Sequence, residues 1–356
     1  MSPPAARPSH AAGPATVDGP ATADGPATAD RPATADGPTT APGPAPATPA
    51  RPATPEQASF LAELIGDGLL LETGVQGVYG HGEAFEDVRE HLENLICATA
   101  AAHGARRLRF PPVLPRRQLE DSGYLTSFPH LTGSVCAFHG SEADAQLQDQ
   151  VASRHEDWSE FQRLTDLALM PAACYPVYPA IAARGRLALG GVCVDTGGAW
   201  VFRREPSEDP ARRQIFHMHE LVRIGEPEVV LAWRDEWAQR GLALLIGLGL
   251  EVELDTANDP FFGRRGRMLA ANQREQALKL ELLVTIAGPA PTAVASFNHH
   301  QDHFGKAYGL ELAQGGVAHT SCLGFGHERI VLALLRAHGL DPTGWPSAVR
   351  DRLWPS

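Results

Sequence analysis

The stretch from His319 to Arg329 constrains the fold most tightly, because it predicts a strand that turns directly into a helix. Its sequence is His-Thr-Ser-Cys-Leu-Gly-Phe-Gly-His-Glu-Arg, and apolar positions continue through Leu340. Gly324 and Gly326 remove side chains at the junction, so the backbone can approach a flat ligand. Arg329 falls in the first helical turn, where a planar, permanently charged guanidinium can lie over a ring or hold a phosphate. A simple turn beside a buried cysteine explains the glycine pair equally well, so function depends on the rest of the chain.

Residues 1–57 differ sharply in composition from the remainder. They consist almost entirely of Ala, Pro, Thr, Gly and Asp, and the run Ala-Thr-Ala-Asp-Gly-Pro at 21–26 recurs with small changes. Such a segment buries too little apolar area to offset its ordering entropy, so we expect a disordered tail. It has neither the apolar core nor the basic start of a signal peptide. Residues 58–356 have the length of one large domain.

Charge and cysteine content exclude several classes of protein. The formal net charge is −12, and about 10 of these negative charges lie outside the tail. This balance disfavours a large nucleic-acid footprint, because phosphate binding needs clustered Lys and Arg. No segment is long and apolar enough to span a bilayer, so no membrane partner is expected. The five cysteines are odd in number and widely spaced, which predicts a cytoplasmic protein with free or metal-bound thiols.

Apolar spacing predicts helices and strands in an order that defines the fold class. The expected helices are 57–72, 83–103, 141–168, 227–248 and 330–340. The expected strands are 107–115, 199–205, 214–224, 250–254, 279–286 and 293–297. We expect strand and loop around Cys174 at 169–180, a loop at 74–82 and irregular or strand-like structure at 123–140. Short links join most neighbouring strands, so we expect an α+β fold in which helices flank an antiparallel sheet. The polar stretch 141–168 is expected to form an appended helical element.

The strands 199–205 and 214–224 form a long hairpin around a polar turn. Arg203 and Glu205 share one face of the first strand, since side chains repeat every two residues. The arginine can hold an α-phosphate and the glutamate can read an amine. A cross-strand ion pair, which is weak at a surface, is an alternative interpretation of the same two residues.

Motifs of class II aminoacyl-tRNA synthetases occur in this chain in the proper order. The helix leading to Pro111-Pro112 resembles motif 1, which builds the dimer interface in that family. The stretch from Phe202 to Glu220 resembles motif 2, and Gly324-Phe-Gly-His-Glu-Arg329 resembles motif 3, whose arginine lies against ATP. Lys279-Leu-Glu281 and Ala295-Ser-Phe-Asn298 are similar to the ATP and amino-acid strands of seryl-tRNA synthetase. The resemblance spans residues 80–340 and implies a class II synthetase-like sheet and a homodimer.

A narrower resemblance concerns a metal site. Cys174, Glu220 and Cys322 match the zinc ligands of the atypical, zinc-dependent seryl-type catalytic domain. Two thiolates and one carboxylate leave an open position on tetrahedral zinc, and in that family the substrate's amino group takes it. The alternative is that the two cysteines are small buried apolar side chains, as most free cysteines are. Because both flank Glu220 of the hairpin in the family's order, the zinc site is the favoured interpretation.

Histidines near these residues are competing metal ligands. His217 and His219 flank Glu220 in sequence and are alternatives to it. The run from Asn298 to His303 is rich in histidine, and we expect it to be a polar loop beside the amino-acid pocket. A metal role for this run is the second possibility.

A seryl-tRNA synthetase has a long N-terminal helical arm that grips tRNA, and residues 58–80 leave no room for one. The chain therefore resembles the stand-alone amino acid:[carrier protein] ligases, which load a small amino acid onto the phosphopantetheine thiol of a carrier protein. The resemblance implies ATP-dependent activation of glycine or alanine, with Zn²⁺ and Mg²⁺ and without tRNA. The resemblance does not give the docking site of the carrier, and we expect it at 141–168. The alternatives are a zinc-dependent seryl-type synthetase and a catalytically silent nucleotide-binding relative. A Cys/His hydrolase is disfavoured, since no motif sets a nucleophile on an elbow.

The same resemblance implies a role for each site residue. Arg203 and Arg329 are expected to bind the ATP phosphates and to stabilise charge during the reaction. The other expected ATP-site residues are Glu205, which reads the adenine amine, Glu281 and Ser296, which hold magnesium or ribose, and Arg213, Phe216, Lys279 and Ala295. Glu220, Asp259 and Asn298 are expected at the amino acid, and Cys174, Glu220 and Cys322 at zinc.

Overall fold

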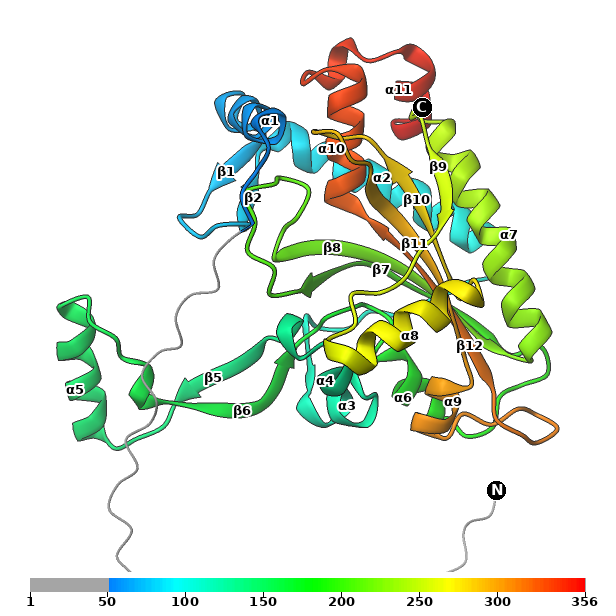
Figure 1. Cartoon of the computed structure of the whole chain (residues 1–356), viewed down its shortest axis with the longest axis horizontal. Helices are drawn as coiled ribbons and strands as arrows, with labels where there is room; N and C mark the ends of the chain where they lie inside the picture. Colours follow the sequence, from blue (N-terminus) through cyan, green and yellow to red (C-terminus); the bar gives the residue numbers. More distant parts are fainter. Residues whose placement is uncertain (1–50, 356) are drawn as a thin grey trace, which may run out of the picture. The chain divides into compact units, whose positions relative to one another are not determined.

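The computed structural model describes residues 51–355, apart from the side chains at positions 264 and 265 (Figure 1). The predicted tail therefore lies outside the described residues up to position 50. The last three residues of the predicted tail, 55–57, are helical, because helix α1 begins at Pro55. Thr54 caps this helix by accepting from the Gln57 backbone N–H, while the Gln57 side chain accepts from the Thr54 N–H.

Helices and strands alternate along the described chain. The helices are α1 (Pro55–Gly66), α2 (Glu83–Ala102), α3 (Arg116–Asp121), α4 (Tyr124–Ser127), α5 (Glu142–Ser153), α6 (Val177–Ala182), α7 (Pro227–Ile246), α8 (Gly263–Glu275), α9 (His303–Tyr308), α10 (His327–His338) and α11 (Ser347–Leu353), with short 3₁₀ turns at Pro129–Leu131, Ser159–Phe161 and Pro342–Gly344. The strands are β1 (Leu70–Glu72), β2 (Tyr79–His81), β3 (Arg106–Arg107), β4 (Val113–Pro115), β5 (Ser134–Phe138), β6 (Gln162–Leu169), β7 (Val192–Phe202), β8 (Ile215–Gly225), β9 (Glu253–Thr256), β10 (Lys279–Val284), β11 (Thr292–Gln301) and β12 (His319–Gly326).

A seven-stranded sheet in the order β3-β7-β8-β12-β11-β10-β9 forms the centre of this unit. Its neighbouring strands are antiparallel, except that β3 runs parallel to β7. Two smaller sheets, β1-β2 and β4-β6-β5, accompany it. Helices α2, α7 and α10 pack on the central sheet, which confirms the predicted α+β fold with helices flanking an antiparallel sheet (Figure 1).

Period-two alternation sends the side chains of β8 and β12 into two different cores. Leu221 and Leu323 join the larger hydrophobic cluster, which includes buried residues of α2, α7 and α10. Val222 and Cys322, one position away, join a second cluster built with α6, α9 and the β4-β6-β5 sheet. Each strand of the central sheet therefore presents alternate residues to opposite faces, and this decides which of them can meet at a site.

Several predicted elements differ from the structure. The helix predicted over 57–72 ends at Gly66, and Leu70–Glu72 pairs instead with Tyr79–His81 in the predicted loop. The strand predicted over 107–115 is divided between β3 and β4, which belong to different sheets. Only Glu142–Ser153 of the stretch 141–168 is α-helical, because Gln162–Leu169 pairs with β4 and β5. Tertiary pairing outweighs local propensity in each of these places.

Helix α5 is the most exposed helix of this region. None of its residues is buried, and it lies at the far end of β5 and β6 from α3 and α4 (Figure 1). Leu147 on this helix and Phe138 at the end of β5 are large apolar side chains left in solvent. Within the described part of the chain, no helix combines the length and apolar character needed to cross a lipid bilayer.

Candidate active site

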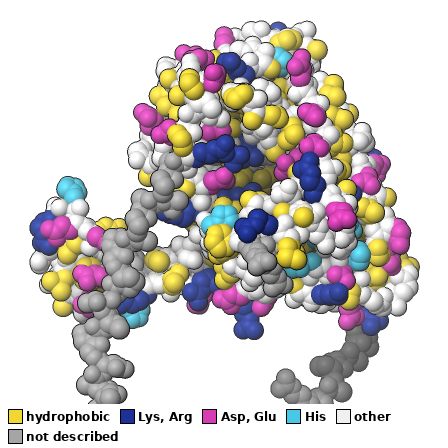
Figure 2. All heavy atoms as spheres, viewed as in Figure 1, with side chains coloured by type: hydrophobic (Ala, Val, Ile, Leu, Met, Phe, Trp, Pro, Cys, Tyr) yellow, Lys and Arg dark blue, Asp and Glu magenta, His cyan; other side chains and the backbone are white. Residues whose placement is uncertain are grey.

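A cavity of about 880 Å³ lies on the face of the central sheet that carries Glu220 and Cys322. Strand register builds its floor in two rows that cross four strands. One row is Glu220, Gly324, Ser296 and Glu281, and the other is Val222, Cys322, Asn298 and Lys279. Figure 2 shows the molecule hollowed on this side, with lysine and arginine side chains around the opening.

Gly324 leaves space at the floor of the cavity, because it has no side chain there. A Cβ atom at this position would lie 2.9 Å from the Met218 sulphur and 3.3 Å from Cγ of Glu220. A larger residue would therefore push both neighbours aside. At Gly326 the nearest atom to a Cβ would be 3.6 Å away, which is an ordinary contact. The predicted need for glycine therefore holds at the first position of the pair and not at the second.

Cys174, Glu220 and Cys322 meet at one end of the cavity. Their ligand atoms lie within 4.8 Å of one another, and all three residues are buried. The two carboxylate oxygens of Glu220 accept from the backbone N–H groups of Ala173 and Cys174, each at 3.0 Å. These hydrogen bonds fix the carboxylate against the loop that carries Cys174.

The charges of this trio favour a bound cation. The contact with Cys322, burial and the Glu220 carboxylate raise the pKa of the Cys174 thiol well above its usual range. Burial also raises the pKa of Glu220, although its hydrogen bonds oppose the change. Three groups that become negative on ionisation are thus concentrated where water cannot stabilise them. Two sulphurs and one carboxylate suit the tetrahedral preference of Zn²⁺ and leave a position open, so the residues fit such an ion.

His300 is a neighbour of this trio that sequence reasoning did not assign. Its Nε2 lies 3.6 Å from the Cys322 sulphur, and its Nδ1 lies 3.2 Å from the Thr320 hydroxyl. Burial, His303 and His299 lower the pKa of His300 to about 3, so the ring is neutral. Asn298 donates from Nδ2 to the same sulphur at 3.7 Å. Both residues can therefore orient the Cys322 ligand.

The histidine-rich run is not the predicted loop. Its first part, through Gln301, is the end of β11, and His303 begins α9. His299 borders the cavity, but the alternation of β11 sends its side chain to the opposite face from that of His300, where its Nδ1 lies 3.0 Å from the Ser321 hydroxyl. The position of His300 was marked in the sequence only by the density of histidines around it.

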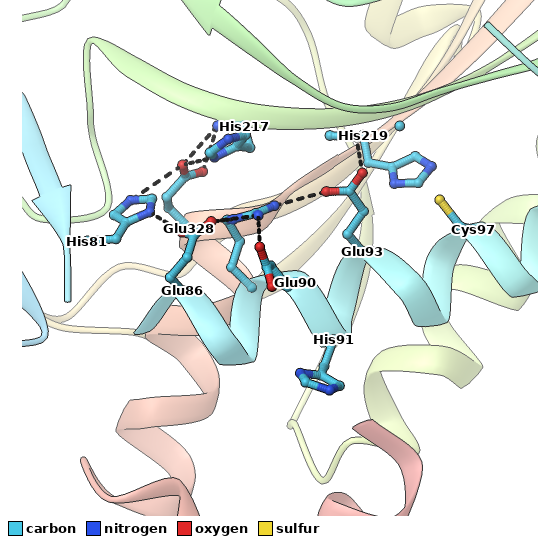
Figure 3. Close-up of polar contacts among 12 residues, drawn as sticks. His81, Glu86, Glu90, His91, Glu93, Cys97, His217, His219 and Glu328 are labelled. Carbon is cyan, nitrogen blue, oxygen red and sulfur yellow. Dashed lines mark hydrogen bonds and ion pairs between the residues drawn. The ribbon is translucent and has the colours of Figure 1, made fainter. Parts of the chain in front are cut away.

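His217 and His219 cannot replace Glu220 as ligands of this trio, since they project from the opposite face of β8. Each belongs to another group of possible ligands on that face, with His81 and Glu328 in one case and with Cys97 and Asp195 in the other. Figure 3 shows both groups beside helix α2.

A guanidinium lies against each of those two groups. Arg213 Nη1 is 2.8 Å from Nε2 of His81. Arg109 lies 4.0 Å from the Cys97 sulphur and 3.7 Å from the Asp195 carboxylate. A positive side chain already occupies the place of a cation there, and it would repel a metal ion. Among the described residues, the trio of Cys174, Glu220 and Cys322 is therefore the best candidate for a metal site.

Arginines gather at the other end of the cavity. Arg329 donates from Nε to the Ala211 carbonyl and from Nη1 to the Ala293 carbonyl, each at 2.8 Å. Burial, and then Arg212 and Arg203, lower the pKa of Arg329 to about 10, which still leaves it charged at neutral pH. Arg212 pairs with Glu205, but Arg203 and Arg329 form no ion pair with a carboxylate among the described residues, so this end is suitable for an anion.

Arg203 and Phe216 lie beside this group. The Arg203 guanidinium carbon is 5.8 Å from the centre of the Phe216 ring, and its Nε donates to the Pro171 carbonyl at 3.3 Å. An arginine and an aromatic ring on one wall can hold a flat base and its phosphates.

Lys279 lies across the cavity, where its Nζ is 2.5 Å from Asp259 and 3.0 Å from Glu281. Burial alone would raise the pKa of Asp259, but Lys279 and Gln273 outweigh it and lower that pKa.

The structure brings most of the predicted site residues to this one cavity. Its lining includes Arg203, Phe216, Glu220, Asp259, Lys279, Glu281, Ala295, Ser296, Asn298, Arg329 and the two cysteines Cys174 and Cys322. Glu205 is outside the lining, because its carboxylate pairs with Arg212 at 2.8 Å. Arg213 lines a small adjoining cavity instead. Ala295 borders the main cavity, but its alternating position on β11 sends its methyl group into the larger core.

Comparison with known proteins gives relatives along most of the chain. No protein-family model matches. Two proteins of Bradyrhizobium diazoefficiens, amino acid--[acyl-carrier-protein] ligases 1 and 2, are each 45% identical to the chain over 290 and 293 residues, which cover 81% of it and 88% and 86% of the two ligases. The type-2 serine--tRNA ligase of Methanopyrus kandleri is 26% identical over 270 residues, 68% of this chain and 50% of that protein.

Solved structures support the fold. The SerRS of M. kandleri, in complex with A. aeolicus tRNASec, matches with a TM-score of 0.71 at 23% identity. The alignment covers 83% of this chain and 60% of that one. Seryl-tRNA synthetase from Pyrococcus horikoshii complexed with ATP matches with a TM-score of 0.60 at 15% identity, over 84% of this chain and 62% of that one. The predicted class II synthetase-like fold is confirmed.

Proposed function

The chain belongs to the family of amino acid--[acyl-carrier-protein] ligases, and from this premise we propose that it activates glycine or alanine with ATP and loads it onto the phosphopantetheine thiol of a carrier protein. One observation carries the proposal beyond the family. A single cavity contains the trio Cys174, Glu220 and Cys322 at one end and the buried Arg329 at the other. Ligands for an amine-binding metal and a buried cation for the phosphates would thus serve the two substrates of an activation reaction.

In the first step, the carboxylate oxygen of the amino acid attacks the α-phosphorus of ATP and diphosphate leaves. Arg203 and Arg329 stabilise the charge that develops on the phosphate oxygens, and Phe216 supports the base. Because both substrates are held in one cavity, the bimolecular reaction becomes effectively unimolecular, which lowers its entropic cost. In the second step, the carrier's thiol attacks the acyl carbon and AMP leaves.

Cys174, Glu220 and Cys322 would hold zinc, which when bound supplies an open coordination position that selects the neutral amine of the substrate. Asn298 and His300 orient the Cys322 ligand. We assign Glu281 and Ser296 to the magnesium ion or ribose of bound ATP, and Asp259 to the amino acid. Glu205, which lies outside the cavity lining, reaches the adenine amine only if its ion pair with Arg212 opens.

The substrate should be small, because aromatic residues line the cavity beside Cys174. Tyr175 and Phe304 pack edge to face with ring centres 5.7 Å apart. We expect exchange of labelled diphosphate into ATP with glycine, alanine or serine, and at least about tenfold weaker exchange with leucine or phenylalanine. Glycine and alanine differ by one methyl group, so their ratio should be modest. Exchange with none of these amino acids, zinc being present, would contradict the proposal.

The acceptor separates this function from that of a minimal seryl-type synthetase. Charged product should pass to a pantetheinylated carrier protein and not to bulk tRNA, because the net charge of the chain is −12 and a tRNA footprint needs clustered cations. The measurement offers the two acceptors separately and assays covalent aminoacylation of each. Acylation of tRNA alone would favour the synthetase.

We propose that the carrier protein docks on residues 141–168. Helix α5 has no buried residue, and two large apolar side chains of this segment are left in solvent. Leu147 on the helix is 50% exposed, and Trp158 beyond it is 45% exposed. Exposed apolar side chains on a projecting element are typical of interaction sites.

We also propose that α2 and the segment through Pro111-Pro112 form a homodimer interface. All five cysteines are free, which supports a cytoplasmic location.

Leu147→Asp should weaken carrier loading by about tenfold or more while leaving ATP–diphosphate exchange unchanged, because a charge would be buried at the docking surface. The matched control is Leu189→Asp, since Leu189 is 75% exposed and lies outside this segment. Equal loading by both variants would remove 141–168 from consideration as the docking site.

A further inference from the structure

A line of partly buried polar contacts connects helix α2 to an arginine of the motif 2 hairpin. Arg213 Nη1 donates to Nε2 of His81 at 2.8 Å. The other ring nitrogen of His81, Nδ1, lies 2.8 Å from Oε2 of Glu86. Glu86 in turn pairs with Arg89 at 2.6 Å, one turn along α2. Figure 3 shows the His81 ring with one contact to Glu86 and another to Glu328.

Arg213 determines which ring nitrogen of His81 carries the proton. A guanidinium has donors only, so Nε2 of His81 must accept, and the proton of the neutral ring must be on Nδ1. That proton is then donated to the Glu86 carboxylate. Burial and Arg213 lower the pKa of His81, which agrees with a neutral ring. The ring therefore has one orientation and one tautomer that satisfy both neighbours.

Arg213 has a donor left over. The residue is 5% exposed, and its Nε donates to the Pro210 carbonyl at 3.3 Å. Its Nη2 has no hydrogen-bond partner among the described residues. Arg213 lines a small cavity with Phe216, Glu328 and Arg329, next to the main cavity. A buried, charged donor without a partner is costly unless a ligand supplies the acceptor.

We infer that His81 is a positioning residue, which holds Arg213 so that its free Nη2 meets a terminal phosphate oxygen of ATP. This inference rests on the proposed function, which assigns ATP to the cavity. Glu328 supports the arrangement from the helix side, since it accepts from the backbone N–H of His217 at 2.9 Å. Its carboxylate also favours the charged form of Arg213, whose pKa burial lowers. His81 belongs to none of the three synthetase motifs.

Two amide substitutions separate the contacts of His81. In His81→Gln, the amide oxygen reaches the position of Nε2 and can accept from Arg213. In His81→Asn, the shorter side chain reaches only the position of Nδ1, next to Glu86. We expect His81→Asn and His81→Ala to raise the KM for ATP in diphosphate exchange by about tenfold or more, and His81→Gln by no more than about threefold. The KM for the amino acid and the zinc content should not change in any of them.

The control is His91→Ala, another histidine near α2 whose Nδ1 contacts the Asp87 carbonyl on the surface. It should retain the wild-type KM for ATP. The inference is overturned if asparagine and glutamine at position 81 give the same KM, whether raised equally with a lower melting temperature or unchanged. A wild-type chain that shows no ATP–diphosphate exchange would instead refute the proposed function, so the two failures are distinguishable.

Discussion

Cys322→Ala is expected to remove zinc from the protein and to lower amino-acid-dependent ATP–diphosphate exchange by more than about a hundredfold. Loss of a residue that merely orients a ligand costs about 10–100-fold in affinity or activity, so loss of the ligand itself should cost more. His217 and His219 cannot substitute for Cys322, because they project from the other face of the sheet. Metal analysis of the purified variant and exchange assays at saturating substrates measure the two effects.

The control for Cys322 is Cys193→Ala, a buried cysteine on β7 that belongs to no group of possible ligands among the described residues. It should retain zinc and exchange. His300→Ala should have an intermediate effect, since it removes one contact to the Cys322 sulphur. His299→Ala, on the opposite face, should not affect zinc. A Cys322→Ala protein that keeps its metal would place the metal elsewhere.

Arg329→Ala is expected to lower kcat/KM for ATP by about 10²–10³-fold, the size of effect found when one charge-stabilising donor is removed from an active site. The guanidinium is buried, remains charged and connects the motif 2 segment at Ala211 to β11 at Ala293. Arg329→Lys should recover little, because an ammonium cannot make the two divergent hydrogen bonds. Steady-state exchange kinetics with varied ATP measure both variants.

Arg336→Ala is the matched control for this prediction, because it lies on the same helix with its guanidinium over Phe60, away from the cavity. It should keep the wild-type kcat/KM. If Arg329→Ala binds and turns over ATP as the wild type does, the arginine end of the cavity is not the phosphate site.

The elements that carry the site were largely predictable from local pattern. The second hairpin strand, predicted at 214–224, is β8 (Ile215–Gly225), and the helix predicted at 83–103 is α2 (Glu83–Ala102). Both have clear period-two or period-3.6 spacing of apolar residues. Helix α8 (Gly263–Glu275) was missed because its composition is strongly polar, so no apolar period distinguished it from a loop. Strand β6 was read as helix because its pairing partners lie far away in sequence.

The site was predictable only in part. Cys174, Glu220 and Cys322 were selected by family resemblance, since no local rule connects residues so distant in sequence, and strand register then brings the last two to one face. The contact between His81 and Arg213 spans 132 residues and had no signal in the sequence. Glu205 was expected at the nucleotide, and its ion pair with Arg212 became visible only once the hairpin turn was folded.

Zinc bound by two thiolates and a carboxylate is the central claim, and metal removal from the wild-type chain tests it most directly. The protein as purified should contain about one zinc ion per chain. Of the three groups of possible metal ligands among the described residues, two have an arginine side chain against them and only the trio of Cys174, Glu220 and Cys322 does not. Chelation should abolish amino-acid-dependent exchange, and Zn²⁺ added back, but not Mg²⁺ alone, should restore it. A metal-free preparation that activates glycine or alanine at the original rate would contradict the claim.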